Sequence, residues 1–264
     1  TGVQTCALPI SLLVLSGAVV GTIVGLTGVG GGSLMTPILV LVFGFHPVAA
    51  VGTDLLYAAV TKSTGSLIHG FSRNIDWRIV GLLAAGSVPA VVITLLTVSA
   101  LGITGNSAAR TTNIALGIAL LITATLLVFR KTILSWRPVR GEPSPRREVS
   151  MTVATGAVLG TLVSLTSVGA GAVGVTALLL LYPALPVVRI VGTDIAHAVP
   201  LTAAAGFGHW WIGNVNFVLL GSLLAGSIPG IMVGSYFATR VPERVLRILL
   251  ATVLVLVAAK LIFS

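Results

Sequence analysis

Charge is scarce in this sequence: 8% of the 264 residues are charged, with 6 acidic residues against 15 Lys or Arg. Soluble domains carry about a quarter charged residues, so the composition excludes an ordinary soluble fold. Enzyme signatures are missing as well, because the glycine-rich segment lacks the Lys-Ser/Thr that would complete a Walker motif, and the sequence has no His-Glu-x-x-His and no Ser/His/Asp nucleophile set. We therefore expect no enzyme activity, no cofactor and no metal site.

Cysteine is nearly absent too, and the single one, Cys6, lies in an unusual stretch. Residues 1–10 read TGVQTCALPI, which resembles the translation of a short-read sequencing adapter. We predict that this stretch is not native, and the codons of the encoding DNA would test the prediction. Without Cys6 the chain has no cysteine, so disulfides and thiolate metal sites are excluded.

Apolar residues, in contrast, are abundant. They make up 56% of the chain, the mean hydropathy is +1.10, and several runs approach the ~20 apolar residues that cross a bilayer. The sequence therefore predicts an all-α, polytopic protein of the bacterial cytoplasmic (inner) membrane. Its net charge of +9 does not indicate nucleic-acid binding, because the basic residues gather at the ends of apolar segments.

The first half of the chain contains five apolar segments, at residues 11–27, 33–45, 48–69, 77–98 and 107–129. A polar, proline-containing stretch follows, which is typical of a linker. We assign residues 11–131 to a first repeat, 132–149 to a cytoplasmic linker and 150–264 to a second repeat within one membrane domain.

The second half repeats the motifs of the first half in the same order. The matching motifs are Gly30-x-Gly32 with Gly169-x-Gly171, Gly52-Thr53-Asp54 with Gly192-Thr193-Asp194, and Gly86-Ser87-x-Pro89 with Gly226-Ser227-x-Pro229. Matches in register and in order are not expected from shared hydrophobicity alone. The chain therefore contains an internal duplication.

The distribution of basic residues predicts how the repeats are oriented. With the linker inside the cell and three crossings in each half, twelve of the 15 Lys and Arg residues fall on the cytoplasmic side. An odd number of crossings inverts the second repeat relative to the first. We therefore expect two inverted-topology repeats with helices broken at mid-membrane, an architecture that recurs in secondary transporters.

The glycine clusters interrupt apolar segments where a spanning helix would otherwise continue. Such glycines allow one helix to end and a short one to start, whose free N–H groups attract anions. Close helix packing is the alternative, because Gly21-x-x-x-Gly25 and Gly28-x-x-x-Gly32 also fit small-xxx-small patterns. The substrate-binding candidates of the two breaks and the two Gly-Thr-Asp motifs are Thr27, Gly30, Gly31, Gly32, Ser33, Thr53, Thr166, Gly169, Gly171 and Thr193.

Ionisable side chains inside apolar segments are the other candidates, because they are costly in a membrane and indicate function. Asp54 and Asp194 are proton-coupling candidates, together with His197, and capping of a helix start is the alternative for the two aspartates. Lys62 is the one cation that we place at mid-membrane. It is a candidate ligand for an anionic substrate, or alternatively the ion-pair partner of one of the aspartates.

The segments Gly28–Gly32, Val51–Thr53 and Asn74–Arg78, in this order and with a second, weaker copy, resemble the TauE/SafE permeases. The resemblance covers residues 11–264. It implies a permease that moves sulfite, a sulfonate or a related sulfur-containing anion by alternating access. The chain departs from the family pattern in the Asp after each Gly-Thr, and in Ser167 and Ala170, which replace glycines in the second copy.

The expected partners are therefore a small anion, the lipid bilayer and a coupling proton or ion, with no nucleic acid. A non-transporting membrane scaffold or an intramembrane enzyme is the alternative function. An enzyme would need a nucleophile–base pair or a metal set within one cavity.

Overall fold

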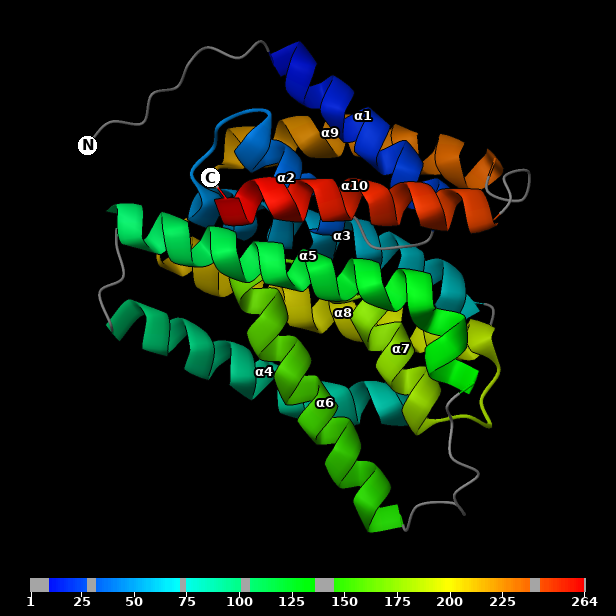
Figure 1. Ribbon diagram of the computed structural model, residues 1–264. Coiled ribbons are helices and arrows are strands. Elements are labelled where there is room, and N and C mark those ends of the chain that lie inside the picture. The colour runs from blue at the N-terminus through cyan, green and yellow to red at the C-terminus, as the bar shows by residue number, and fades with distance from the viewer. Residues whose placement is uncertain are drawn as a thin grey trace.

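The computed structural model describes residues 10–27, 32–71, 75–100, 105–135, 145–237 and 243–263. All regular structure among these residues is α-helical (Figure 1). The helices are α1 (Ile10–Thr27), α2 (Gly32–Leu41), α3 (Pro47–Phe71), α4 (Trp77–Ala100), α5 (Gly105–Ser135), α6 (Pro145–Thr166), α7 (Ala172–Leu181), α8 (Val187–Trp211), α9 (Phe217–Phe237) and α10 (Glu243–Phe263). The predicted all-α fold is confirmed.

The helices follow the predicted segments, with differences at the boundary between the two halves. α4 begins at Trp77 as expected, whereas α5 continues beyond residue 129 to Ser135. α6 already begins at Pro145. Both helices thus extend into the stretch predicted as a linker, of which residues 136–144 lie outside the described part.

Several helices are long and apolar enough to cross a bilayer. Five such spans occur among the described residues: Trp77–Ala100, Ala109–Phe129, Arg146–Thr166, Val187–Trp211 and Phe217–Gly234. Large apolar side chains on these and other helices point outward, and Leu96, Val158, Leu256 and Met232 are 64–70% exposed. Such surfaces are unfavourable in water and are suited to lipid. The chain is an integral membrane protein, as the sequence predicted.

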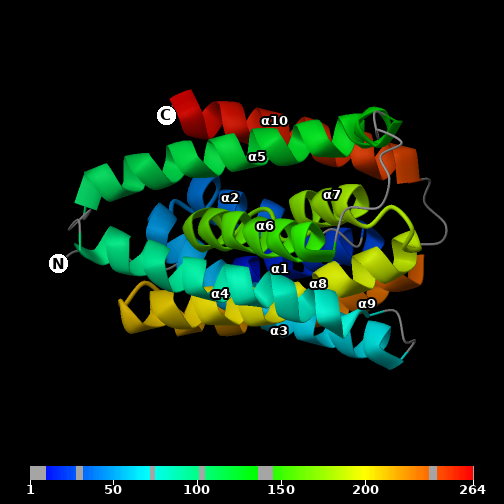
Figure 2. The same cartoon turned by 90° about the horizontal axis from the view of Figure 1, so that it is seen from below.

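Two helices are too short to span. α2 and α7 have 10 residues each, which is about 15 Å of helix and half of the ~30 Å hydrocarbon core. Figure 2 shows α2, α6 and α7 between the α5–α10 pair on one side and α3, α4, α8 and α9 on the other. The short helices therefore lie inside the helix bundle.

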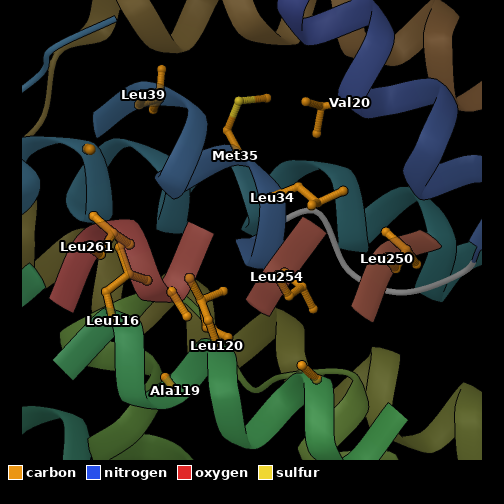
Figure 3. Packing of buried hydrophobic residues seen from close by; sticks show 14 of the residues in the cluster. Val20, Leu34, Met35, Leu39, Leu116, Ala119, Leu120, Leu250, Leu254 and Leu261 are labelled. Atoms are coloured by element: carbon orange, nitrogen blue, oxygen red, sulfur yellow. The ribbon is translucent and has the colours of Figure 1, made fainter. Parts of the chain in front are cut away.

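Apolar packing fixes the position of α2. Leu34, Met35 and Leu39 on this helix belong to a cluster that also takes in Val20 of α1 (Figure 3). α5 and α10, which pack against each other, close the cluster from the other side with Leu116, Leu120, Leu250, Leu254 and Leu261. In a bilayer the alternative to such burial is lipid and not water, so these side chains stabilise the position of α2 through close van der Waals packing.

Helices of one half pack against helices of the other half in a reciprocal pattern. α1 packs along α9, and α6 packs along α4, which are the matching elements with the halves exchanged. At the contacts, a Cβ at Gly21 would collide with the backbone of Ser227, and one at Gly160 would collide with the backbone of Ser87. Gly21 is thus a close-packing glycine, as the small-xxx-small alternative proposed.

Two hydrogen bonds also join equivalent residues of the two halves, with the halves exchanged. The Asp76 N–H donates to Thr193 Oγ1 at 2.9 Å, and the Asn216 N–H donates to Thr53 Oγ1 at 3.1 Å. Each bond joins a residue just before a long helix of one half to the Gly-Thr-Asp motif of the other. Such exchanged contacts are expected of two repeats related by an approximate two-fold axis. The inverted orientation of the repeats in the membrane stays a prediction.

Gly86 and Gly81 on α4 give a matched test of this packing. A Cβ at Gly86 would collide with the Val153 carbonyl oxygen of α6, whereas a Cβ at Gly81 meets nothing within 4 Å. We expect Gly86→Ala to lower the free energy of unfolding by about 1–3 kcal/mol through overpacking. Gly81→Ala should be neutral or raise it by up to about 1 kcal/mol, because alanine favours helix over glycine. Thermal unfolding of the two variants in detergent measures the difference, and equal stabilities would contradict the packing.

Candidate functional site

The break between α6 and α7 is built from backbone conformations that favour glycine. α6 ends at Thr166, and Ser167, Gly169 and Gly171 follow with φ of 58°, 115° and 141°. The Thr166 hydroxyl donates to the Leu162 carbonyl at 2.7 Å and accepts the Val168 N–H at 3.1 Å. The Thr166 hydroxyl therefore binds the backbone at the end of α6, both as a donor and as an acceptor.

The start of α7 leaves backbone donors free. The Gly174 N–H donates to the Gly169 carbonyl at 3.2 Å, and the Val175 N–H to the Gly171 carbonyl at 2.8 Å. The hydrogen bonds found among the described residues include none donated by the N–H of Ala172 or Val173, and Gly171 supplies no side-chain cap. These free donors and the helix dipole give this end of α7 a positive electrostatic potential.

Lys62 reaches this break from α3. Its Nζ donates to the Ala170 carbonyl at 2.7 Å, and the side chain is half-buried. Lys62 interacts electrostatically with both Asp54 and Asp194. Within the described part of the chain, however, no salt bridge of 4.0 Å or less joins its ammonium group to either carboxylate. Lys62 is therefore held by a neutral carbonyl group and is not locked in a direct ion pair.

Asp54 is fully buried on α3 and is bound by a neighbouring helix. Its Oδ2 accepts a hydrogen bond of 2.5 Å from Thr36 Oγ1 of α2. Ser167, the first residue of the break, lies beside the same carboxyl group, although its hydroxyl does not meet hydrogen-bond geometry. Asp54 Oδ1 has no hydrogen-bond partner in the described part of the chain. One hydroxyl group, that of Thr36, thus donates to this carboxyl group and stabilises its charge.

Asp194 is buried on α8, and its surroundings differ from those of Asp54. It is 1% exposed, and no described residue donates a hydrogen bond to its Oδ1. The same oxygen packs directly against Gly174, in the first turn of α7. Lys62 is the charged group that acts on it. The Asp194 carboxyl group therefore lies next to the positive end of a helix, where anions bind.

These residues form what we call the central polar cluster: Thr36, Asp54, Lys62, Ser167 and Asp194, together with the Ala170 carbonyl. Four elements supply them, namely α2, α3, the α6–α7 break and α8. The sequence predicted Lys62, Asp54 and Asp194 as functional residues, and the fold brings these three together. Among the described residues, no group of three His, Cys, Asp or Glu side chains could hold a metal ion.

His197 lies one turn from Asp194 but is bound elsewhere. A hydrogen bond of 2.9 Å joins its Nε2 to Ser87 Oγ of α4, and Nδ1 has no partner among the residues that the structure describes. The matching pair in the other half is Tyr57 of α3 and Ser227 of α9, which lie side by side. His197 and Tyr57 therefore occupy equivalent helix contacts, and the described hydrogen bonds of His197 include none to the central polar cluster.

Thr53 and Thr193 are not brought into the cluster. As described above, both accept backbone N–H groups that precede α4 or α9, and Thr193 also donates to the Arg189 carbonyl at 2.7 Å. Both side chains are 0% exposed. Their hydroxyl groups hold the two halves together at the ends of these helices.

The first glycine break falls largely outside the described residues. Gly30 and Gly31 lie in the gap 28–31. Thr27, Gly32 and Ser33 belong to the ends of α1 and α2, and their side chains lie outside the described part as well. The described site is therefore that of the second break, with Gly169 and Gly171.

Five residues of this region were missed by the sequence reasoning: Thr36, Ser167 and Ala170 in the cluster, and Tyr57 and Ser87 outside it. A signal existed for Ser87, because Gly-Ser-x-Pro recurs in both halves. α2 and α7 also place Thr36 and Thr176 at equivalent positions, five residues into each helix. Tyr57 carried no such signal, since its counterpart is His197.

Known proteins are similar to this chain over most of its length. The sulfite exporter TauE/SafE family model matches residues 13–261. The probable membrane transporter protein YjnA of Bacillus subtilis (strain 168) is 36% identical over 252 residues, which covers 95% of this chain and 98% of the relative. The probable membrane transporter protein YdhB of the same organism is 26% identical over 253 residues, with 89% and 93% covered. No solved structure matches the chain.

Proposed function

Because this chain is a membrane transporter of the sulfite exporter TauE/SafE family, we propose that it moves a small sulfur oxyanion or sulfonate across the cytoplasmic membrane. We further propose that the substrate binds at the central polar cluster. The two repeats would expose this site to either side of the membrane in turn, as in other transporters with repeated halves.

The observation that carries the proposal is Lys62 at the break. A lysine ammonium has three donors, and one of them is bound to the Ala170 carbonyl. The other two have no hydrogen-bond partner among the described residues and can donate to a substrate. A cation at this depth is expensive unless it has a role, and an anionic substrate supplies both the missing acceptors and the opposite charge.

The start of α7 supports the same substrate class. The free N–H groups of Ala172 and Val173 follow in the chain after Gly171, one residue beyond the Ala170 carbonyl that holds Lys62. A sulfonate or sulfite group carries three oxygens around one sulfur atom. It can therefore accept from an ammonium group and from backbone N–H groups at once, as oxyanions do at other helix starts.

A binding screen tests this proposal. Isothermal titration of the detergent-purified chain with methanesulfonate, sulfite, acetate and choline should detect binding of the sulfur oxyanions with a Kd of about 1 mM or tighter. Acetate should bind more weakly, because it has one oxygen fewer, and choline should not bind. Binding of choline alone, or of no anion at any pH between about 5 and 8, would contradict an anion site.

A further inference from the structure

We propose that Asp194 is an internal anion that competes with the substrate, and that one proton is taken up by Asp194 for each anion bound. This inference rests on the proposed function, since it concerns the same site. It assigns different roles to the two aspartates: Asp54 stays ionised as the counter-charge of Lys62, and Asp194 changes its protonation state.

The charge count of the cluster requires such a proton. Asp54, Asp194 and Lys62 together carry a formal charge of −1 when all are ionised. A monoanionic substrate would bring the formal charge of the cluster to −2 in a buried site, where charges interact far more strongly than in water. One proton on a carboxylate offsets the added charge, so proton uptake and anion binding favour each other.

The hydrogen bonds select Asp194 as the group that takes the proton. Asp54 accepts a hydrogen bond from the Thr36 hydroxyl, and such a donor favours the ionised carboxylate. Oδ1 of each aspartate is buried without a partner, but the hydrogen bonds found among the described residues include one to Asp54 Oδ2 and none to Asp194. An ionised carboxylate without donors is costly to bury, so protonation removes a larger penalty at Asp194.

The position of Asp194 explains the competition. Its Oδ1 touches Gly174 in the first turn of α7, next to the free N–H groups of Ala172 and Val173. Its charge also acts on Lys62. The carboxylate therefore faces the two features proposed to bind the substrate. Once it is protonated, the end of α7 and Lys62 are available to an anion from solution.

We expect none of the other titratable groups named here to take up the proton in place of Asp194. His197 on α8 is bound to Ser87 of α4, and Tyr57 of α3 lies beside Ser227. At the start of α4, Asp76 is paired with Arg189 at 3.3 Å. α7 has no titratable residue, and those of α6 lie in its first turn, at 146–148.

Proton counting by calorimetry tests the inference. Methanesulfonate is the probe, because it remains a monoanion throughout the working pH range. Titrations in two buffers with different ionisation enthalpies, at about pH 8, should show uptake of about one proton per anion. The apparent affinity should then fall about tenfold per pH unit at the alkaline end of the range, by proton linkage. Asp194→Asn should bind methanesulfonate with about zero protons taken up and no pH dependence.

Two further variants test whether Asp194, and not another carboxyl group, takes up the proton. Asp76→Asn removes a carboxylate outside the cluster and should leave the count at about one proton. Gly174→Ala keeps the carboxyl group but pushes a methyl group into Asp194 Oδ1, so the midpoint of the pH dependence should shift. It also provides the test if Asp194→Asn does not fold, because an unshifted midpoint would overturn the assignment.

The outcomes separate this inference from the proposed function. If the wild-type chain binds methanesulfonate without proton uptake, or if Asp194→Asn still takes up a proton, the role of Asp194 is wrong and the anion site stands. If methanesulfonate, sulfite and acetate all fail to bind at every pH, the proposed function fails and this inference fails with it.

Discussion

Replacing Lys62 with glutamine should weaken methanesulfonate binding by a factor of about 100 or more. Lys62 is the positive charge of the central polar cluster, and its Nζ has donors that no described residue uses. Removing one partner of a buried charge interaction costs about 3–5 kcal/mol, and 1.4 kcal/mol corresponds to a factor of ten in Kd. Glutamine keeps an N–H donor and has nearly the same length, but it removes the charge.

Calorimetric titration of this variant measures the loss, and thermal unfolding shows whether the variant is folded. The matched control is Lys260→Gln, which removes an exposed lysine near the end of α10 and should leave the affinity within a factor of two. A folded Lys62→Gln protein that loses less than tenfold in affinity would show that Lys62 does not bind the anion. Lys62→Arg should bind more weakly than wild type, because the longer guanidinium group cannot keep the contact with Ala170 unchanged.

Replacing Gly169 with alanine should reduce the transport rate by about tenfold or more. Gly169 has φ of 115°, which an alanine adopts only with strain of about 1–3 kcal/mol. A Cβ at this position would also lie 2.9 Å from Leu162 Cδ2. The strain at this φ favours a backbone shift at the residue directly before Ala170, and we expect the carbonyl that holds Lys62 to shift with it.

Gly213→Ala is the matched control. Gly213 also has a positive φ, 85°, but it lies in the turn between α8 and α9, where an added Cβ would meet nothing within 4 Å. Its replacement should lower stability without changing the transport rate per folded protein. Uptake of a labelled sulfonate into proteoliposomes measures both variants, and equal rates for the two would contradict a functional role for the break.

The Gly-Thr-Asp motifs illustrate how far the sequence can identify a site. The sequence predicted Thr53 as a substrate-binding residue and Asp54, the next residue along the chain, as a proton-coupling one. Successive residues of a helix, however, point about 100° apart. Asp54 consequently faces Thr36 and the break, while Thr53 accepts the Asn216 N–H. Thr193 and Asp194 separate in the same way.

The sequence offered a contact between Lys62 and one of the aspartates only as an alternative, for a different reason. Lys62 and Asp194 lie on α3 and α8, which are far apart in the sequence and meet only through the packing of the two halves. The internal duplication gave no help at this position, since Lys62 is matched by Thr202. The same holds for His197, whose ring is bound by Ser87 of a third helix.

The break between α6 and α7 depends both on the local sequence and on the tertiary structure. The sequence by itself determined the membrane location, the helical segments, the duplication and the break, because hydrophobic runs and glycines act through local physical chemistry. Only the tertiary structure decided that Lys62 binds the Ala170 carbonyl and that Asp194 packs against the start of α7. Those contacts depend on which helices pack together and on how each is rotated about its axis, and long-range packing sets both.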